Sequence, residues 1–105
     1  MYLRVLNFKF PNELAKKSVI ALTRNTTKDQ FKNGLLMRLH ADVSPNISVA
    51  VLLWRSKKDY EEAYKVFGSK FIADMKELGT LVTTNEGPAE VDKAKEIDYS
   101  KFNEL

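Results

Sequence analysis

A buried strand that runs directly into a helix constrains this chain more than any other stretch of its sequence. Residues 48–53 read Ser-Val-Ala-Val-Leu-Leu, an apolar run that is too short and too β-branched to be a helix by itself. Trp54 follows, and Ser56 precedes Asp59 at the spacing of a helix-capping box. The sequence therefore predicts a strand, a tryptophan near its end, and a helix that starts at Ser56.

Composition limits the class of protein. The 105 residues suit one domain, and a hydrophobic content of 44% is typical of a folded globular chain. There is no cysteine, which excludes disulfides and thiolate metal sites, and the single histidine, His40, excludes a poly-histidine metal site within one chain. No apolar run reaches the roughly 20 residues of a membrane span, and no secretory signal is visible. We expect a cytoplasmic protein with no metal, no cofactor and no membrane contact.

Alternating apolar residues predict the first strand over residues 3–10, and Pro11 ends it because proline cannot donate to a sheet. Asn12 is then a good N-cap for the first helix. Residues 24–27, Arg-Asn-Thr-Thr, lower the helix propensity, so we expect the helix to fray or break there. Asn33-Gly34 reads as the turn that leads out of it.

The next two strands are predicted over residues 35–43, which alternate most clearly, and over residues 47–55. A short turn at Ser44-Pro45-Asn46 makes them an antiparallel hairpin. The length of this turn is ambiguous by one residue, and one residue of slippage reverses every side chain. The sequence therefore leaves open whether Trp54 faces the odd-numbered or the even-numbered residues of strand 35–43.

The second helix carries an apolar stripe that Gly68-Ser69 is expected to interrupt, and Gly79 is a natural residue to end it. Residues 80–84 are predicted to form the fourth strand. Residues 85–88, Asn-Glu-Gly-Pro, are expected to break all regular structure.

Charge divides the chain at the same place. Residues 1–84 hold 14 Lys and Arg and 8 Asp and Glu, whereas residues 85–105 hold 3 Lys and 6 Asp and Glu. We therefore separate a domain over 1–84 from an acidic tail over 85–105. Opposite charges favour docking of the tail on the domain or on a partner subunit, although both segments could equally be solvated.

The order β-α-β-β-α-β is that of the ferredoxin-like motif, an α+β fold with a four-stranded antiparallel sheet and two helices on one face. The other face is not polar enough to meet water alone, because both faces of the first strand carry apolar residues, which predicts a partner. RNA-recognition modules share this layout, but residues 48–53 lack their Gly-Phe-rich motif and the lysines are dispersed. We expect no nucleic-acid partner.

The sequence at this point resembles the dimeric α/β-barrel superfamily, which includes antibiotic-biosynthesis-type monooxygenases. The resemblance rests on residues 52–60, Leu-Leu-Trp-Arg-Ser-Lys-Lys-Asp-Tyr, and on the Asn33-Gly34 turn before the second strand. The resemblance covers residues 1–84. It implies a homodimer that packs two open sheet faces together into a dimeric α/β barrel, and a small-molecule pocket between each sheet and its own helices.

The resemblance also implies that Trp54 and Tyr60 line this pocket, as a Trp and a Tyr at these places do in cofactor-independent oxygenases. The alternative is that both are core aromatics. Asn7 is an amide in mid-strand, which is disfavoured unless it has partners or faces a polar cavity. Haem-degrading members carry an Asn nearby, but Ala63 and Ala73 stand where they need a Trp and an axial His. We exclude haem degradation.

His40 shares one strand face with Arg38 and Asp42. It is the only side chain that ordinarily titrates near neutral pH, and it is a catalytic candidate together with Tyr60. Asp42 could orient its ring and Arg38 could hold an anionic substrate. The plainer interpretation, which we prefer, is a polar ladder that protects an edge strand.

Tyr64, Phe67 and Phe71 belong to the apolar stripe of the second helix, as core residues first and as pocket lining by position. Such a lining favours an apolar or amphipathic ligand with one anionic end, fatty-acid-like or aromatic and polyketide-like. Arg4 and Arg55 add positive charge that could serve a carboxylate or pair with the acidic tail.

Three functions remain. The first is a homodimer that binds a small molecule in an apolar pocket. The second is a cofactor-independent monooxygenase or isomerase acting on a small aromatic or apolar substrate, and the third is a purely structural or regulatory interaction domain. Convergence of Asn7, Trp54 and Tyr60 on one cavity separates the first two, because the oxygenase arrangement fails if these residues point to different faces.

Overall fold

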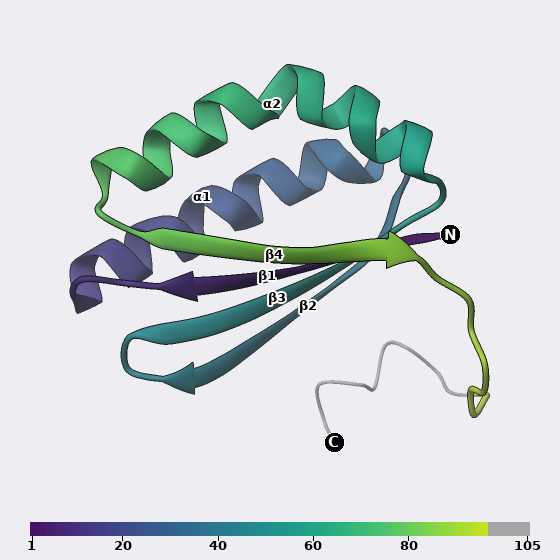
Figure 1. Cartoon of the computed structure of the whole chain (residues 1–105), viewed down its shortest axis with the longest axis horizontal. Coiled ribbons are helices and arrows are strands. Elements are labelled where there is room, and N and C mark those ends of the chain that lie inside the picture. Colours follow the sequence, from purple (N-terminus) through teal and green to yellow (C-terminus); the bar gives the residue numbers. More distant parts are fainter. Residues whose placement is uncertain (97–105) are drawn as a thin grey trace.

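Two helices cover one face of a four-stranded antiparallel sheet (Figure 1). The computed structural model describes residues 1–96. Its elements are β1 (Tyr2–Lys9), α1 (Glu13–Phe31), β2 (Leu35–Ser44), β3 (Ile47–Trp54), α2 (Lys57–Glu77) and β4 (Leu81–Pro88). The strands lie in the order β2-β3-β1-β4, so the predicted ferredoxin-like fold is confirmed. Within the described part, neither helix is long and apolar enough to cross a membrane.

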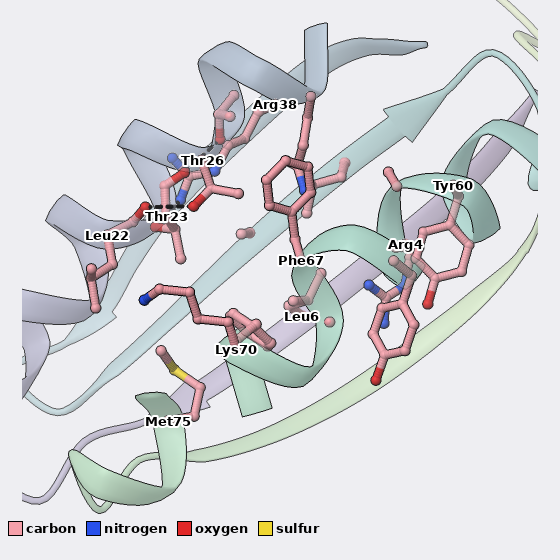
Figure 2. A pocket seen from close by; sticks show the side chains of 18 of the residues that line it. Arg4, Leu6, Leu22, Thr23, Thr26, Arg38, Tyr60, Phe67, Lys70 and Met75 are labelled. Carbon is pink, nitrogen blue, oxygen red and sulfur yellow. Dashed lines mark hydrogen bonds between the residues drawn. The ribbon is translucent and has the colours of Figure 1, made fainter. Parts of the chain in front are cut away.

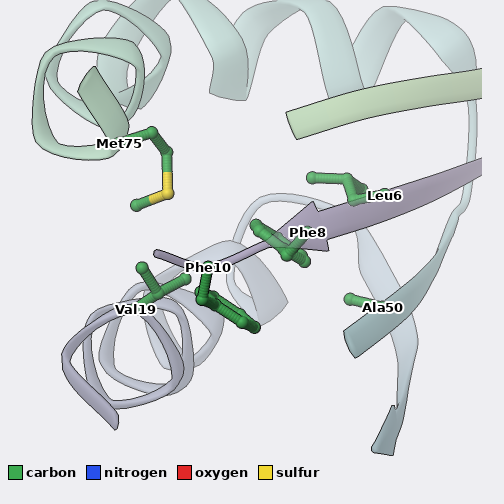
Figure 3. Close-up of a cluster of buried hydrophobic side chains, with 6 residues drawn as sticks. All are labelled: Leu6, Phe8, Phe10, Val19, Ala50 and Met75. Atoms are coloured by element: carbon green, nitrogen blue, oxygen red, sulfur yellow. The ribbon is translucent and has the colours of Figure 1, made fainter. Parts of the chain in front are cut away.

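The core lies between the sheet and the helices. Leu6 and Phe8 of β1 point toward the helices, where they pack with Phe10, Val19 of α1 and Met75 of α2 (Figure 3). All five side chains are buried. Because strand residues alternate between faces, their odd-numbered neighbours on β1 point away from the helices.

A second buried cluster surrounds the end of β3 and joins Tyr2, Leu35, Trp54 and Ala63. Leu35 pairs with Trp54 whereas Met37 pairs with Leu53, so the register shifts by one residue between them. This bulge turns Leu35 to the helix side and Met37 to the open side. Strict alternation would put Leu35 on the same face as Met37, and this prediction is wrong. Beyond the bulge, the even-numbered residues of β2 lie on the same side of the sheet as Trp54.

Both predicted helix starts are confirmed. The Ala15 N–H donates to Asn12 Oδ1 over 2.8 Å, and the Asp59 N–H donates to Ser56 Oγ over 3.1 Å. Each side chain satisfies an amide that the first helical turn leaves free. Gly79 follows α2 with a φ of +64°, as the predicted helix end requires.

Neither helix breaks where the sequence predicted. In α1, the Thr26 hydroxyl donates to the Leu22 carbonyl and the Thr27 hydroxyl to the Thr23 carbonyl, so these groups are satisfied inside the helix. In α2, Gly68 is buried beneath the ring of Tyr64. A Cβ atom at Gly68 would lie 2.7 Å from that ring, so glycine is here a packing residue and not a helix end.

The fourth strand is longer than predicted. It continues through residues 85–88 and pairs with β1 from Leu81 opposite Lys9 to Pro88 opposite Tyr2. The full length of β1 is available as a partner, and proline is tolerated at the end of an edge strand. Residues 89–96 form no helix or strand. The remaining tail residues, 97–105, and their predicted docking lie outside the described residues.

The face of the sheet opposite the helices is strongly apolar. The pairing registers bring residues of β1, β2 and β3 together on it. Its larger apolar members on these three strands are Leu3, Val5, Met37, Leu39, Ile47, Val49, Val51 and Leu53. We call this side of the sheet the open face.

The loop before β2 depends on a glycine. Gly34 has a φ of +105°, and its carbonyl accepts from the Arg55 N–H over 2.8 Å. A Cβ atom there would lie 2.7 Å from Asp59 Cγ, against the side chain that pairs with Arg55. The turn thus ties the start of β2 to the start of α2.

Gly34→Ala is therefore expected to lower the free energy of unfolding by about 1–3 kcal/mol, through a left-handed backbone and a steric clash. Urea unfolding measures this loss. Gly87→Ala is the matched control, because a Cβ there meets nothing within 4 Å. Equal stability of the two variants would contradict the role given to Gly34.

Candidate functional site

A cavity of about 140 Å³ lies between the sheet and the two helices. Strands β1, β2 and β3 form its floor, and α1 and α2 form its walls (Figure 2). Its aromatic lining comprises Phe8, Trp54, Tyr60, Tyr64, Phe67 and Phe71. Five of these were predicted as pocket residues, and Phe8 was not.

Trp54 is both a core residue and a wall of this cavity. Its side chain is 1% exposed and its ring centroid lies 5.9 Å from that of Tyr60. Its indole Nε1 is buried and has no hydrogen-bond partner among the described residues. An unpaired buried donor of this kind costs about 1–3 kcal/mol.

One end of the cavity is closed by a cation over an aromatic ring. The guanidinium of Arg4 lies 4.4 Å from the centroid of Tyr60, and Arg4 Nε donates to Glu86 Oε2 over 2.9 Å. Glu86 belongs to β4, so the strand extension supplies this counter-charge. Burial raises the pKa of the Tyr60 hydroxyl, and the nearby Arg4 opposes that rise. Tyr60 is therefore held as the neutral phenol at neutral pH.

The other end carries Arg38 (Figure 2). Its guanidinium Nη2 donates to Thr23 Oγ1 over 2.9 Å. No carboxylate among residues 1–96 lies within ion-pair distance of it. Burial lowers the pKa of Arg38, and Arg24 lowers it further. The two ends of the cavity thus differ, since Arg4 is neutralised by Glu86 and Arg38 has no anionic partner.

Asn7 does not join this site. It is paired with Val49 and Thr83 on the open face, opposite to the side of the neighbouring Leu6 and Phe8. The expected convergence of Asn7 with Trp54 and Tyr60 is not found, so the oxygenase arrangement that needs all three is excluded. Because side chains alternate along a strand, a shift of one residue decides whether an amide such as Asn7 points into the cavity or onto the open face.

His40 lies on the same side of β2 as Arg38 but does not line the cavity. Asp42 does not orient its ring, because the Asp42 carboxylate pairs with Lys16 Nζ over 2.9 Å. His40 Nε2 is buried without a partner among the described residues. His40 is therefore outside the lining, and its place in the structure gives no support to its candidacy as a catalytic residue of this cavity.

Helix α1 contributes a polar wall to the cavity that was not predicted from the sequence. Thr23, Thr26, Thr27 and Gln30 line the cavity, at the spacing i, i+3, i+4 and i+7 of one helix face. We expected this helix to fray or break over residues 24–27, so the helical spacing of these polar residues was not recognised. A polar stripe that continues an apolar one was the signal that could have revealed it.

The environment of His40 predicts a pH effect on stability. Burial lowers the pKa of its imidazole below its usual 6.5, Arg38 lowers it further, Asp42 opposes this, and Arg24 and Lys16 add smaller decreases. As the pH falls through 6.5, the unfolded chain takes up this proton before the folded chain does. The free energy of unfolding should therefore fall over that window.

His40→Gln is expected to remove this decrease, because glutamine does not titrate. Urea unfolding at pH 7.5 and just below pH 6 compares the two proteins, and carboxylates contribute equally to both. An identical loss of stability on acidification in wild type and variant would contradict the assignment to His40.

Known structures place the fold. No protein-family model and no curated protein sequence matches the chain. The chain is similar to the structure of a dimeric ferredoxin-like protein from an uncultured marine organism, with a TM-score of 0.69 and 15% identity over 90% of this chain and 100% of that one.

Two oxygenases are similar as well. One is SnoaB, a cofactor-independent oxygenase from Streptomyces nogalater, with a TM-score of 0.70 and 15% identity over 88% of this chain and 97% of that one. The other is a monooxygenase from the gene ActVA-Orf6 of Streptomyces coelicolor, in complex with nanaomycin D, with a TM-score of 0.62 and 10% identity over 89% and 92% of the two chains. This chain therefore has the ferredoxin-like fold that dimeric proteins and antibiotic-biosynthesis-type monooxygenases share.

Proposed function

We propose that this protein is a homodimer that binds a small aromatic molecule in the cavity between its sheet and its helices. The observation that carries the proposal is the cavity itself, which aromatic side chains of β1, β3 and α2 line between the sheet and the helices. These rings would cover the apolar part of a ligand.

The size of the cavity limits the ligand. A buried apolar cavity of about 150 Å³ holds a single benzene ring. The cavity here, at about 140 Å³, therefore suits one ring with a short substituent. A fatty-acid chain or a fused polyketide ring system would have to extend beyond it, or the helices would have to separate.

The open face supports the homodimer. Eight apolar residues of three strands share it, and such a surface exposed to water is unusual for a monomer. A second copy that packs the same face against it would bury the whole patch in an isologous interface. The similar protein from the marine organism is described as dimeric.

A cofactor-independent oxygenase is the second candidate. Its support is the likeness to SnoaB together with the tilted contact between Trp54 and Tyr60 at the cavity. Without a cofactor, the substrate itself must supply all four electrons that reduce O₂. One atom of O₂ would enter the substrate as a carbonyl, and the other would leave as water with the two hydrogens of the oxidised carbon. In this version Asn7 has no part.

Ligand binding can be followed through the only tryptophan of the chain. Phenylacetamide, which carries one ring and a neutral oxygen acceptor, is expected to change the emission of Trp54 in a saturable way. Thr26→Phe places a ring in the cavity and should weaken this binding at least about tenfold. Native mass spectrometry provides an independent measure of the complex.

Asn25→Phe is the matched control, because Asn25 is the exposed neighbour of Thr26 and does not line the cavity. Its affinity should equal that of the wild type. Absence of saturable binding in the wild type, or equal weakening by both substitutions, would refute the cavity as the binding site. An oxygen electrode with phenylacetone, which has one ring and an activated CH₂ group, as the probe distinguishes turnover from binding, since the oxygenase candidate requires uptake of O₂ that Trp54→Phe reduces.

The dimer is tested by light scattering. The wild type is expected at about twice the chain mass of 12.0 kDa. Val51→Glu places a charge on the open face and should yield folded monomer, because an unpaired charge is costly at a dry interface. Val66→Glu on α2, where the valine is 69% exposed, should leave the dimer intact. A monomeric wild type would refute the proposal.

A further inference from the structure

The charges around the cavity are not balanced. Arg4, at one end, has its charge offset by Glu86, and Lys70, on α2, pairs with Asp74 over 2.7 Å. Arg38 lines the cavity as a half-buried cation with no ion pair among the described residues. Buried charges in folded proteins are normally paired. The one uncompensated cation of the described lining is therefore at the α1 end.

The hydroxyl groups beside Arg38 are not free to hold an anion. The Thr23 hydroxyl donates to the Ile20 carbonyl and accepts from Arg38, and the hydroxyls of Thr26 and Thr27 donate to helix carbonyls. A hydroxyl has a single proton to donate. An anion at this end would therefore be bound by donors other than these hydroxyls, and the guanidinium of Arg38 is the charged one among them.

Arg38 has the donors to do so. A guanidinium carries five N–H groups, and the contact with Thr23 engages one of them. Thr23 thereby fixes the plane of the fork in the wall between α1 and β2 (Figure 2). A fixed fork binds a planar carboxylate more strongly than a mobile one, because less side-chain entropy is lost.

Given the binding function proposed above, we propose that Arg38 is the carboxylate anchor of this cavity, and that the natural ligand is an aryl carboxylate with one ring and a short acid side chain. The ring lies among Phe67, Phe71 and Phe8, and the carboxylate meets Arg38 at the α1 end. Thr23 is a positioning residue that holds the guanidinium.

Phenylacetate and phenylacetamide test this assignment, since they share size and shape and differ in charge. Isothermal titration of the wild type at pH 7 is expected to give at least about tenfold tighter binding of the acid, as a charge-assisted hydrogen bond replaces a neutral one. Arg38→Gln should remove this preference, because it weakens binding of the acid at least about tenfold more than binding of the amide. Arg38→Lys, which keeps the charge and loses the fork, should retain part of it.

Two arginine variants serve as controls. Arg24→Gln removes an exposed charge that lies near Arg38 and does not line the cavity. Arg4→Gln removes the cation at the opposite end. Both should keep the preference for the acid. Equal loss in Arg24→Gln would mean that the general positive field attracts the acid, and loss in Arg4→Gln alone would place the carboxylate at the other end; either result overturns the inference.

The wild-type comparison needs no variant and separates the two proposals. Equal affinity for acid and amide would refute the anchor and leave the binding function standing. No binding of either compound would refute the binding function, and the anchor with it.

Discussion

The burial of Trp54 at the junction of β3 and α2 is the interaction on which the rest of this structure depends. The side chain is 1% exposed and packs with Leu35 and Ala63, which join the sheet to α2. Burial of so large an aromatic side chain contributes several kcal/mol, which few other contacts in the chain can match. The Ser56 cap starts α2 two residues later, so the axis of α2 and the cavity wall follow from the same junction.

A cavity remains beside this junction, because the side chains of the two helices do not fill all the space above the sheet. A cavity lined by aromatic side chains would by itself bind apolar molecules with little discrimination. In our proposal the charged groups supply the discrimination: Glu86 neutralises Arg4 at one end, and among the described residues Arg38 at the other end has only a threonine as partner. Binding of a small molecule and its orientation are thus properties of different residues.

Much of the fold was predictable because it rests on local rules. Strand alternation, the Asn12 and Ser56 caps and the Gly79 helix end all use residues within one or two turns of each other. The wrongly predicted helix breaks also have a physical cause. Gly68 and the threonines of α1 have weak helix propensity, but a tyrosine ring and back-bonded hydroxyls compensate for it. These contacts join residues four apart in the same helix, and they offset propensity differences of about 1 kcal/mol or less.

The sequence by itself determined the order of the elements, the helix starts and the aromatic stripe of α2, because each is a periodic or short-range pattern. Only the tertiary structure decided which of these residues meet. One bulge after Leu35 and the register of β1 place Trp54 and Arg38 in the cavity and Asn7 on the open face. Pairing between distant strands sets the register, and a shift of one residue moves a side chain across the whole sheet.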